Sequence, residues 1–295
     1  MWQALEPIHA VTYFEPEPQQ HCAELGTKGY WMSYFAQRAA PLGPVGPEVV
    51  TALFYGFAPA RVSRAVPDVW AVASPATFLD ARLAAVDAAL RRLLGADVIA
   101  SAALAEAAEI ATAAAAAAPT AGRALGAANA ALPVPEEPHL ALWRAQTVLR
   151  EHRGDGHVAA LLTGGIDPVE SLVLVAAGAP VEQEAVRSPE NWRTWRGWTA
   201  DEWLAGAVRL AGRGLVESSG PAVAPVLTPA GARVRREIET RTEELAEVPW
   251  AAVGDSAADR LLELALPLRT AVLAGGFPAV NPIGMEGDGP LAVDR

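Results

Sequence analysis

The sequence predicts a mainly α-helical protein made of tandem winged-helix-like units, each containing a helix-turn-helix, with a small β wing. Residues 75–94 carry leucine and valine at helical spacing, on one stripe. Residues 157–177 have the pattern of two helices joined by a glycine turn. Residues 199–248 have the pattern of a helix, a short hairpin and a long helix, which is the order of elements in a winged unit.

The length, charge and cysteine content limit the classes of function that this chain can have. The 295 residues suffice for two domains, and the formal net charge of −11 disfavours nucleic-acid binding, which ordinarily uses a basic face. Cys22 is the only cysteine and leaves no internal disulfide, and the N-terminus lacks the basic and apolar regions of a signal peptide. We therefore expect a cytoplasmic protein. No membrane span is expected, because no run of about 18 large apolar residues occurs.

Prolines divide the beginning of the chain. Those at positions 7, 16 and 18 disfavour helix, so we expect two extended pieces within residues 1–21, at 6–7 and 15–18. Helices are expected at about 22–40, 47–54 and 60–65, each ending near a proline or glycine.

Three further helices are expected between residue 75 and the middle of the chain. The first covers about 75–94, because Ser74-Pro75 supplies an N-cap and a first-turn proline, and Gly95 ends the apolar stripe. Residues 100–131 are rich in alanine and predict two further helices, broken at Pro119.

The segment 132–138 contains three prolines and is the best candidate for a domain boundary. It divides the chain into an N-terminal helical, winged-helix-like domain of residues 1–131 and a C-terminal winged-helix domain of residues 139–295. The second domain is expected to end in a helical extension.

The helix-turn-helix is expected soon after this boundary. A helix over about 139–153 ends at the glycines of residues 154–156, and a short helix follows at about 157–162. The turn Gly164-Gly165 then leads into a helix at about 167–177.

The wing is expected after residue 198. Thr199 caps a helix that extends to about residue 212, and short strands at 215–216 and 226–227 flank a turn at 218–221. Thr228-Pro229 then begins a long helix that extends to about residue 248.

A weak internal repeat suggests duplication. Residues 47–59 and 156–168 match at a constant offset, which superposes a valine, a leucine, a glycine and a proline. The second half then holds about ten extra residues within 181–198. If the halves are duplicates, the fold is a pseudo-twofold pair of winged units with a cleft between them, although alanine-rich composition also produces chance matches.

The second half resembles MarR-like winged-helix proteins over residues 139–248. The stretches that carry this resemblance are Leu210-Ala211-Gly212-Arg213-Gly214-Leu215-Val216 and Leu227-Thr228-Pro229-Ala230-Gly231. The whole chain is also similar to an actinobacterial family of helix-turn-helix proteins, through residues 6–14, 38–43 and 149–160. These resemblances imply a fold and, more weakly, transcription regulation.

The acidic residues at the start of the helix over 199–212 argue against DNA binding. A MarR-like protein would place the start of the helix at 199–212 against the base edges. Asp201 and Glu202 stand there, where their charges would face phosphates. They are equally explained as acids that stabilise a helix N-terminus.

The segment Arg187–Trp198 interleaves arginine with Trp192, Trp195 and Trp198. This set would hold phosphates, stack on bases or close over an aromatic or anionic ligand. The alternative is a loop that its tryptophans attach to the core while the arginines stay solvated.

A polar cluster around the glycines supplies the candidate site. His157 and His152 are candidate acid–base groups, because histidine titrates near neutrality, and Arg153 lies between them. The alternative is that Asp155 caps a helix and the glycines only turn the chain. A metal site is not expected, because the two histidines are five residues apart and do not share a helical face.

The first half adds further candidate ligand-binding residues. These are His9, Tyr13, Tyr34, Arg38 and Tyr55. Tyr34 and Arg38 share a helical face at four-residue spacing, and core packing is the alternative role for the tyrosines. No nucleophile elbow, phosphate loop, dinucleotide fingerprint or zinc-finger spacing occurs, so the sequence implies no particular cofactor.

Two functions follow from these observations. The favoured hypothesis is a small-molecule-binding protein on a repurposed winged-helix scaffold, with a pocket between the two halves and with or without catalysis on the ligand. The alternative is a ligand-responsive MarR-like DNA-binding transcriptional regulator.

Overall fold

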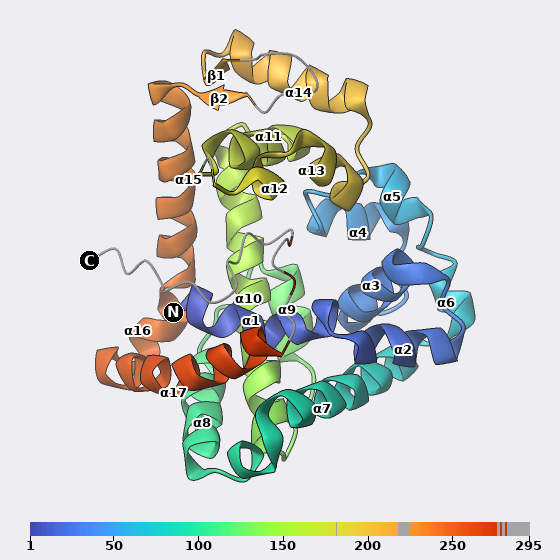
Figure 1. The fold of residues 1–295 in the computed structure, drawn as a ribbon, viewed down its shortest axis with the longest axis vertical. Coiled ribbons are helices and arrows are strands. Elements are labelled where there is room, and N and C mark those ends of the chain that lie inside the picture. The colour runs from blue at the N-terminus through green and yellow to red at the C-terminus, as the bar shows by residue number, and fades with distance from the viewer. Residues whose placement is uncertain (181, 218–224, 276–277, 279–280, 282–295) are drawn as a thin grey trace.

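Helices make up nearly all of the regular structure in the computed structural model, which describes residues 1–295 except 181, 218–224, 276–277, 279–280 and 282–295 (Figure 1). The helices of the first half are α1 (Trp2–Phe14), α2 (Pro16–Leu25), α3 (Gly29–Ala39), the 3-10 helix η1 (Ala40–Leu42), α4 (Pro47–Leu53), α5 (Pro59–Ser63), α6 (Val69–Val72), α7 (Pro75–Ile99), α8 (Ala102–Ala116) and α9 (Ala124–Ala130). Those of the second half are α10 (Pro138–Thr163), α11 (Pro168–Gly178), α12 (Glu184–Arg187), α13 (Pro189–Arg196), α14 (Ala200–Gly212), α15 (Pro229–Ala246), α16 (Val248–Val253) and α17 (Asp255–Ala274). The strands β1 (Val216–Glu217) and β2 (Val226–Leu227) pair antiparallel, with Val216 opposite Leu227.

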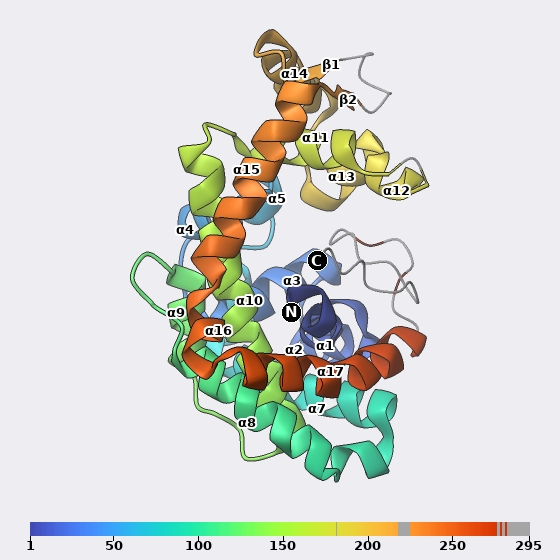
Figure 2. The same cartoon turned by 90° about the vertical axis from the view of Figure 1, so that its left-hand side faces the viewer.

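Helix α10 connects the two ends of the molecule. Residues 140–149 belong to a core shared with α1, α7, α8 and α17, whereas Ala160 and Leu161 belong to a second core shared with α11, α14 and α15. Figures 1 and 2 show α15 beside α10, with α14 and the strands at one end and α7, α8 and α17 at the other. The first core draws on both sides of residues 132–138, so the domain division at that segment stays a prediction.

The helix-turn-helix and the small sheet are confirmed. The end of α10 leads through Gly165, whose φ of 62° favours glycine, into α11, where Asp167 and Glu170 form a capping box. Thr199 and Glu202 form a second capping box at the start of α14. The expected wing turn at 218–221 lies outside the described residues.

The N-terminal segment corrects one prediction. The pieces 6–7 and 15–18, which were expected to be extended, lie in the helices α1 and α2, except for Glu15, which joins the two helices. Helix α1 continues through its internal proline because Leu5, Ile8 and Val11 are buried in the first core. Burial of each such side chain contributes about 1.5–3 kcal/mol, which together exceeds the cost of about 3 kcal/mol for the proline. The helix expected at 22–40 is instead the end of α2 and all of α3, separated at Gly26.

The glycines at 154–156 do not break a helix, because α10 runs through them without interruption. A Cβ built at Gly156 would lie 2.1 Å from Arg123 Nη1 and 3.2 Å from Leu245 Cβ. This glycine therefore permits α15 and the start of α9 to approach α10 closely. Packing on both sides compensates for the low helix propensity of glycine, about 1 kcal/mol per residue relative to alanine.

The remaining elements follow the prediction in part. Gly95, where a helix was expected to end, instead kinks α7, which continues to Ile99, and the break near Pro119 is present between α8 and α9. The segment 187–198, expected as a loop, is largely the helix α13. Among the described residues strands occur only in the second half, and α5 has five residues where α11 has eleven, so neither tandem winged units nor internal duplication is confirmed.

Candidate ligand-binding site

A cavity of about 300 Å³ lies between the helix-turn-helix and helices α1, α3 and α4. Its described wall includes ten aromatic side chains, five arginines and one acidic residue, Glu239. The aromatic residues are Trp2, Tyr13, Phe14, Tyr30, Trp31, Tyr34, Phe54, Tyr55, Phe57 and Trp192. The arginines are Arg38, Arg150, Arg153, Arg196 and Arg235. These residues come from both sides of the segment 132–138.

One face of α10 forms a long side of the cavity. Arg150, Arg153, Gly154, His157 and Leu161 all line it, at spacings of three and four residues. This stripe exists because α10 is continuous through its glycines, so side chains before and after them share a face.

An aromatic layer covers the opposite side. Trp31 and Tyr34 of α3 contact Phe57, with ring centroids 5.6 and 5.5 Å apart, in the edge-on and tilted arrangements that aromatic pairs prefer. The guanidinium of Arg38 lies 4.2 Å above the ring of Phe54, a cation–π contact. The cavity therefore combines apolar ring surfaces with cations.

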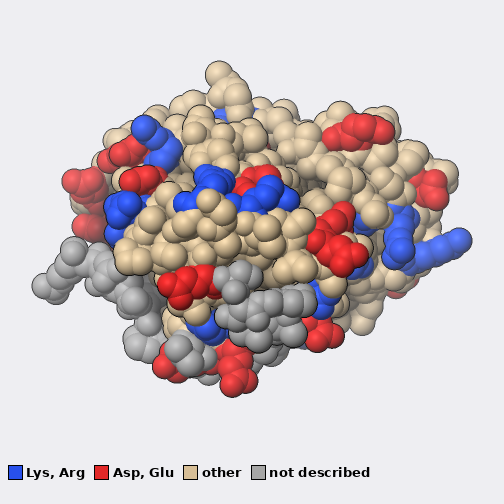
Figure 3. All heavy atoms as spheres, turned by 90° about the horizontal axis from the view of Figure 1, so that it is seen from above, with Lys and Arg blue, Asp and Glu red and all other residues tan. Residues whose placement is uncertain are grey.

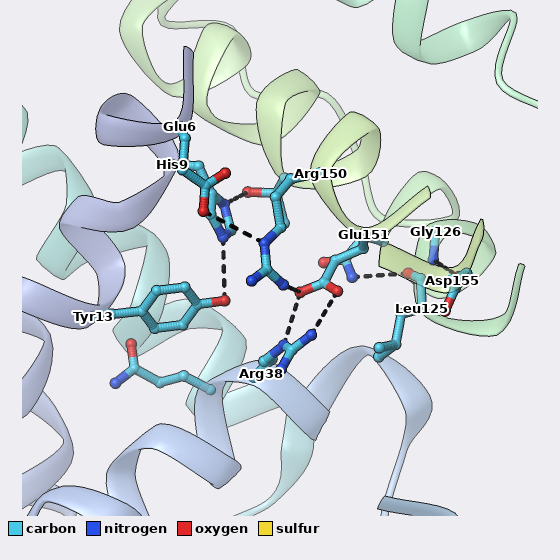
Figure 4. Close-up of polar contacts among 12 residues, drawn as sticks. Glu6, His9, Tyr13, Arg38, Leu125, Gly126, Arg150, Glu151 and Asp155 are labelled. Atoms are coloured by element: carbon cyan, nitrogen blue, oxygen red, sulfur yellow. Dashed lines mark hydrogen bonds and ion pairs between the residues drawn. The ribbon is translucent and has the colours of Figure 1, made fainter. Parts of the chain in front are cut away.

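A buried charge network joins α1, α3 and α10 at one end of the cavity (Figure 4). Arg38 donates two hydrogen bonds of 2.9 Å to the two carboxylate oxygens of Glu151, whose side chain is 1 % exposed. Arg150 donates a third, of 3.0 Å, and lies 3.6 Å from Glu6. The bidentate pairing fixes the Arg38 guanidinium in orientation.

Burial and pairing act oppositely on the two carboxyl groups of this network. Burial alone would raise the pKa of Glu151, but the guanidinium groups of Arg38 and Arg150 outweigh it and hold that pKa below its usual value. At Glu6 burial dominates and the pKa is raised, although Arg150 opposes the shift. The two arginines therefore share one carboxylate whose ionised form they stabilise, and Arg150 also lies beside a second whose burial opposes ionisation.

Tyr13 is held at the same end by a hydrogen-bond chain. Thr147 Oγ1 donates to Trp143 O at 2.9 Å, so its only hydroxyl proton is used and it accepts from His9 Nδ1 at 3.1 Å. His9 Nε2 is then the acceptor for the Tyr13 hydroxyl, also at 3.1 Å. Burial, and next the charge of Arg150, keep the pKa of His9 well below its usual value, so His9 is a neutral acceptor that positions the phenol.

His157 has the same arrangement at the other end of the stripe. Thr242 Oγ1 donates to Ile238 O at 2.7 Å and accepts from His157 Nδ1 at 2.9 Å. Nε2 is therefore the unprotonated nitrogen of the ring, and no described residue forms a hydrogen bond with it. Burial lowers the pKa of His157, which keeps the imidazole neutral.

The structure brings seven of the eleven predicted site residues to the cavity wall. They are Tyr13, Tyr34, Arg38, Tyr55, Arg153, His157 and Trp192. Tyr55 contributes its ring, while its hydroxyl donates to Ile166 O in the helix-turn-helix turn at 2.6 Å. His9 lies behind the wall and acts on it through Tyr13.

The other three predicted residues have different roles. His152 packs against the backbone of α9 and faces a second, smaller cavity, and burial followed by the charge of Arg123 lowers its pKa to about 4. Trp195 packs edge-on against Trp192 in the core. Trp198 donates from Nε1 to Gly56 O at 2.9 Å. Both tryptophans thus attach the segment to the body of the protein, which is the structural alternative stated above.

Sequence reasoning missed several wall residues. Arg150 and Gly154 were hidden by the expected helix break, since only a continuous helix places them on the face of His157. Tyr30 and Trp31 precede Tyr34 by four and three residues, a spacing that a search for aromatic stripes would have found. Asp155 was expected to cap a helix, but its carboxylate accepts a hydrogen bond from Gly126 N–H at 2.9 Å.

The exposed side of α14 is not basic. Asp201 and Glu202 are exposed at its start, and Arg209 is paired with Asp167 and with Glu170 at 3.3 Å. Arg213 lies 3.2 Å from the same Glu170 carboxylate. On the face that Figure 3 shows, cationic and acidic side chains stand in small mixed groups without a continuous basic stripe.

Two further observations bear on partners. Within the described part of the chain, no group of three or more His, Cys, Asp or Glu side chains is arranged to hold a metal ion. No single described helix is both long and apolar enough to cross a bilayer, although two helix pairs that bend at short breaks reach that length and hydropathy together.

Comparison with known proteins gives a family but no close relative. Neither the curated proteins nor the solved structures contain a match. The model of a helix-turn-helix family matches residues 1–278, which include every helix that forms the cavity. The chain therefore belongs to this helix-turn-helix family.

Proposed function

We propose that this protein binds a small organic anion with an apolar, ring-containing body in the cavity between its helix-turn-helix and helices α1, α3 and α4. The observation that carries the proposal is the composition of the described wall, where ten aromatic side chains and five arginines accompany one acid. Ligand sites are typically apolar with a few placed polar groups.

The charge network favours an anion over a cation. Arg38 and Arg150 share Glu151, while burial favours the neutral form of Glu6. A carboxylate or similar group at this end would accept charge-assisted hydrogen bonds from the guanidinium groups, which outnumber the acids of the described wall by five to one. A volume of about 300 Å³ is at the small end for ligand pockets and suits a molecule of one or two rings.

Catalysis on the ligand stays part of the proposal. Tyr13 and His157 are the wall groups through which a proton would pass to or from a bound molecule. His152, which was also expected to serve, faces a different cavity.

The test uses 2-naphthoate, an anion with two fused rings, titrated into the protein by calorimetry. Gly154→Leu is expected to abolish binding, because a Cβ at Gly154 meets only Glu151 Oε2, at 3.8 Å, and the longer side chain would fill the cavity. Gly212→Leu is the matched control, since a Cβ at this glycine of α14 has no neighbour within 4 Å. Failure of the wild type to bind, or equal binding by both variants, would reject the proposal.

A ligand-responsive DNA-binding regulator is the second candidate, favoured by the family and by the α10–α11–α14 arrangement. The hydrogen bond from Tyr55 to Ile166 gives a bound ligand a direct contact with the helix-turn-helix turn. The mixed charges around α14 weigh against it. Kinship to MarR-like proteins, actinobacterial origin and cytoplasmic location are carried as parts of the proposal.

A further inference from the structure

The stripe on α10 spaces two different chemical groups along the cavity. Arg150 stands beside Glu151 and Arg38 at one end, and His157 stands seven residues later on the same face. Seven residues of α-helix rise about 10 Å, and 3.6 residues per turn bring both side chains to one side. A ligand that touches both groups must therefore extend along the helix.

Gly154 leaves room between them. It lies at the midpoint of the stripe, in regular helix, where its conformation does not require glycine. A Cβ there would meet only the Glu151 carboxylate, in ordinary van der Waals contact at 3.8 Å, so packing does not require glycine either. The missing side chain exposes α10 backbone to the cavity, as at sites where a ligand approaches closely.

The two ends differ in hydrogen-bonding character. At the Arg150 end the guanidinium groups can only donate. At the His157 end Nδ1 is occupied by Thr242, so Nε2 is an acceptor. The charged groups beside His157 are Arg153 and Glu239, which lie 3.3 Å from each other.

We propose that the ligand is bifunctional, with an anionic group at the Arg38–Arg150 end and a hydroxyl or N–H donor, across one or two rings, that His157 Nε2 accepts. This inference rests on the proposed function and adds the second functional group and its distance. His157 is then the residue that selects among anions of similar size.

The experiment compares three ligands by calorimetry: 2-naphthoate, 6-methoxy-2-naphthoate and 6-hydroxy-2-naphthoate. Only the last carries a donor opposite its carboxylate. The wild type should bind it roughly three- to tenfold more tightly than the other two, as one net hydrogen bond implies. His157→Asn keeps a donor toward Thr242 but removes the acceptor, so it should lose this preference while still binding 2-naphthoate. His157→Gln supplies an amide oxygen near the position of Nε2 and should retain part of it.

The outcomes separate the two proposals. If 2-naphthoate binds and Gly154→Leu blocks it, but the wild type shows no preference for the hydroxyl compound, the bifunctional ligand is rejected and the proposed function stands. A preference that persists in His157→Asn rejects it as well. If none of the three compounds binds the wild type, both proposals fail.

Discussion

At the scale of single residues, the polar end of the cavity depends on Glu151. Its carboxylate is almost fully buried and accepts hydrogen bonds from two arginines. Removing one partner of such a network leaves uncompensated buried charge. Sequence reasoning placed Tyr13, Arg38 and His157 among the site residues but not Glu151. An acid between two polar neighbours does not stand out in the sequence, and its role becomes visible only when α10 packs against α3.

Glu151→Gln should therefore lower the free energy of unfolding by about 3–5 kcal/mol. The matched control is Glu243→Gln, which removes one of the two carboxylates paired with Arg153, at a side chain that is 64 % exposed. Exposed pairs contribute about 0–1 kcal/mol. Urea titration of both variants measures the difference. Equal losses in the free energy of unfolding would show that the buried network contributes no more to stability than an exposed pair.

Asp155 gives a prediction about pH. Burial raises its pKa to about 6, although the hydrogen bond from Gly126 opposes the shift. Because the pKa of Asp155 is higher in the folded protein than in the unfolded chain, protonation of Asp155 stabilises the fold. This contribution is complete when the pH is below the unfolded-state pKa, and it is lost as the pH rises through about 6. In urea titrations, Asp155→Asn should therefore exceed the wild type in stability at pH 8 by a larger margin than at pH 4. A constant difference between the two pH values would contradict this.

At the scale of elements, capping residues and apolar periodicity predicted helix starts correctly where the local sequence determines the structure. Ser74-Pro75, Thr199 and Thr228 each begin a helix as expected. The failures included α1 and α10, where proline and glycine argued for breaks. Both helices are surrounded by other helices, so tertiary packing outweighs local propensity, and packing partners distant in the chain cannot be identified from propensity.

The two glycines of α10 provide the test of that explanation. Gly156→Ala should destabilise the protein by about 1–3 kcal/mol, because its Cβ would displace Arg123 from its hydrogen bonds to His152 O and Leu245 O. Gly154→Ala should stabilise it by about 0.5–1 kcal/mol, since the new methyl group meets no close neighbour and improves helix propensity. Thermal melts compare the two. The explanation fails if the substitutions have the same sign.

At the scale of the whole molecule, the sequence predicted a mainly helical chain with a helix-turn-helix, and both the structure and the family match agree. The position of the cavity beside the aromatic layer of α3 was not predicted, because it depends on how the first half folds against α10. The acidic composition has a global consequence, since the net charge of −11 accompanies two arginines at the end of α14, Arg209 and Arg213, that are both paired with Glu170 of α11.

Binding to random duplex DNA should consequently be weak at physiological salt, with a shallow dependence of log affinity on log salt concentration. Fluorescence anisotropy between about 50 and 200 mM salt measures that slope. Arg209→Ala and Arg213→Ala serve as comparisons, and neither should change the slope by more than about one phosphate contact. A slope that corresponds to six or more phosphate contacts would favour the regulator instead.

The most direct measurement is a crystal structure of the protein with 2-naphthoate. We expect the naphthalene rings in the cavity along Gly154, between α10 and the aromatic layer, with the carboxylate within hydrogen-bond distance of Arg38 or Arg150. A cavity that stays free of naphthoate at saturating concentration, or naphthoate bound only elsewhere on the protein, would contradict the proposed binding site.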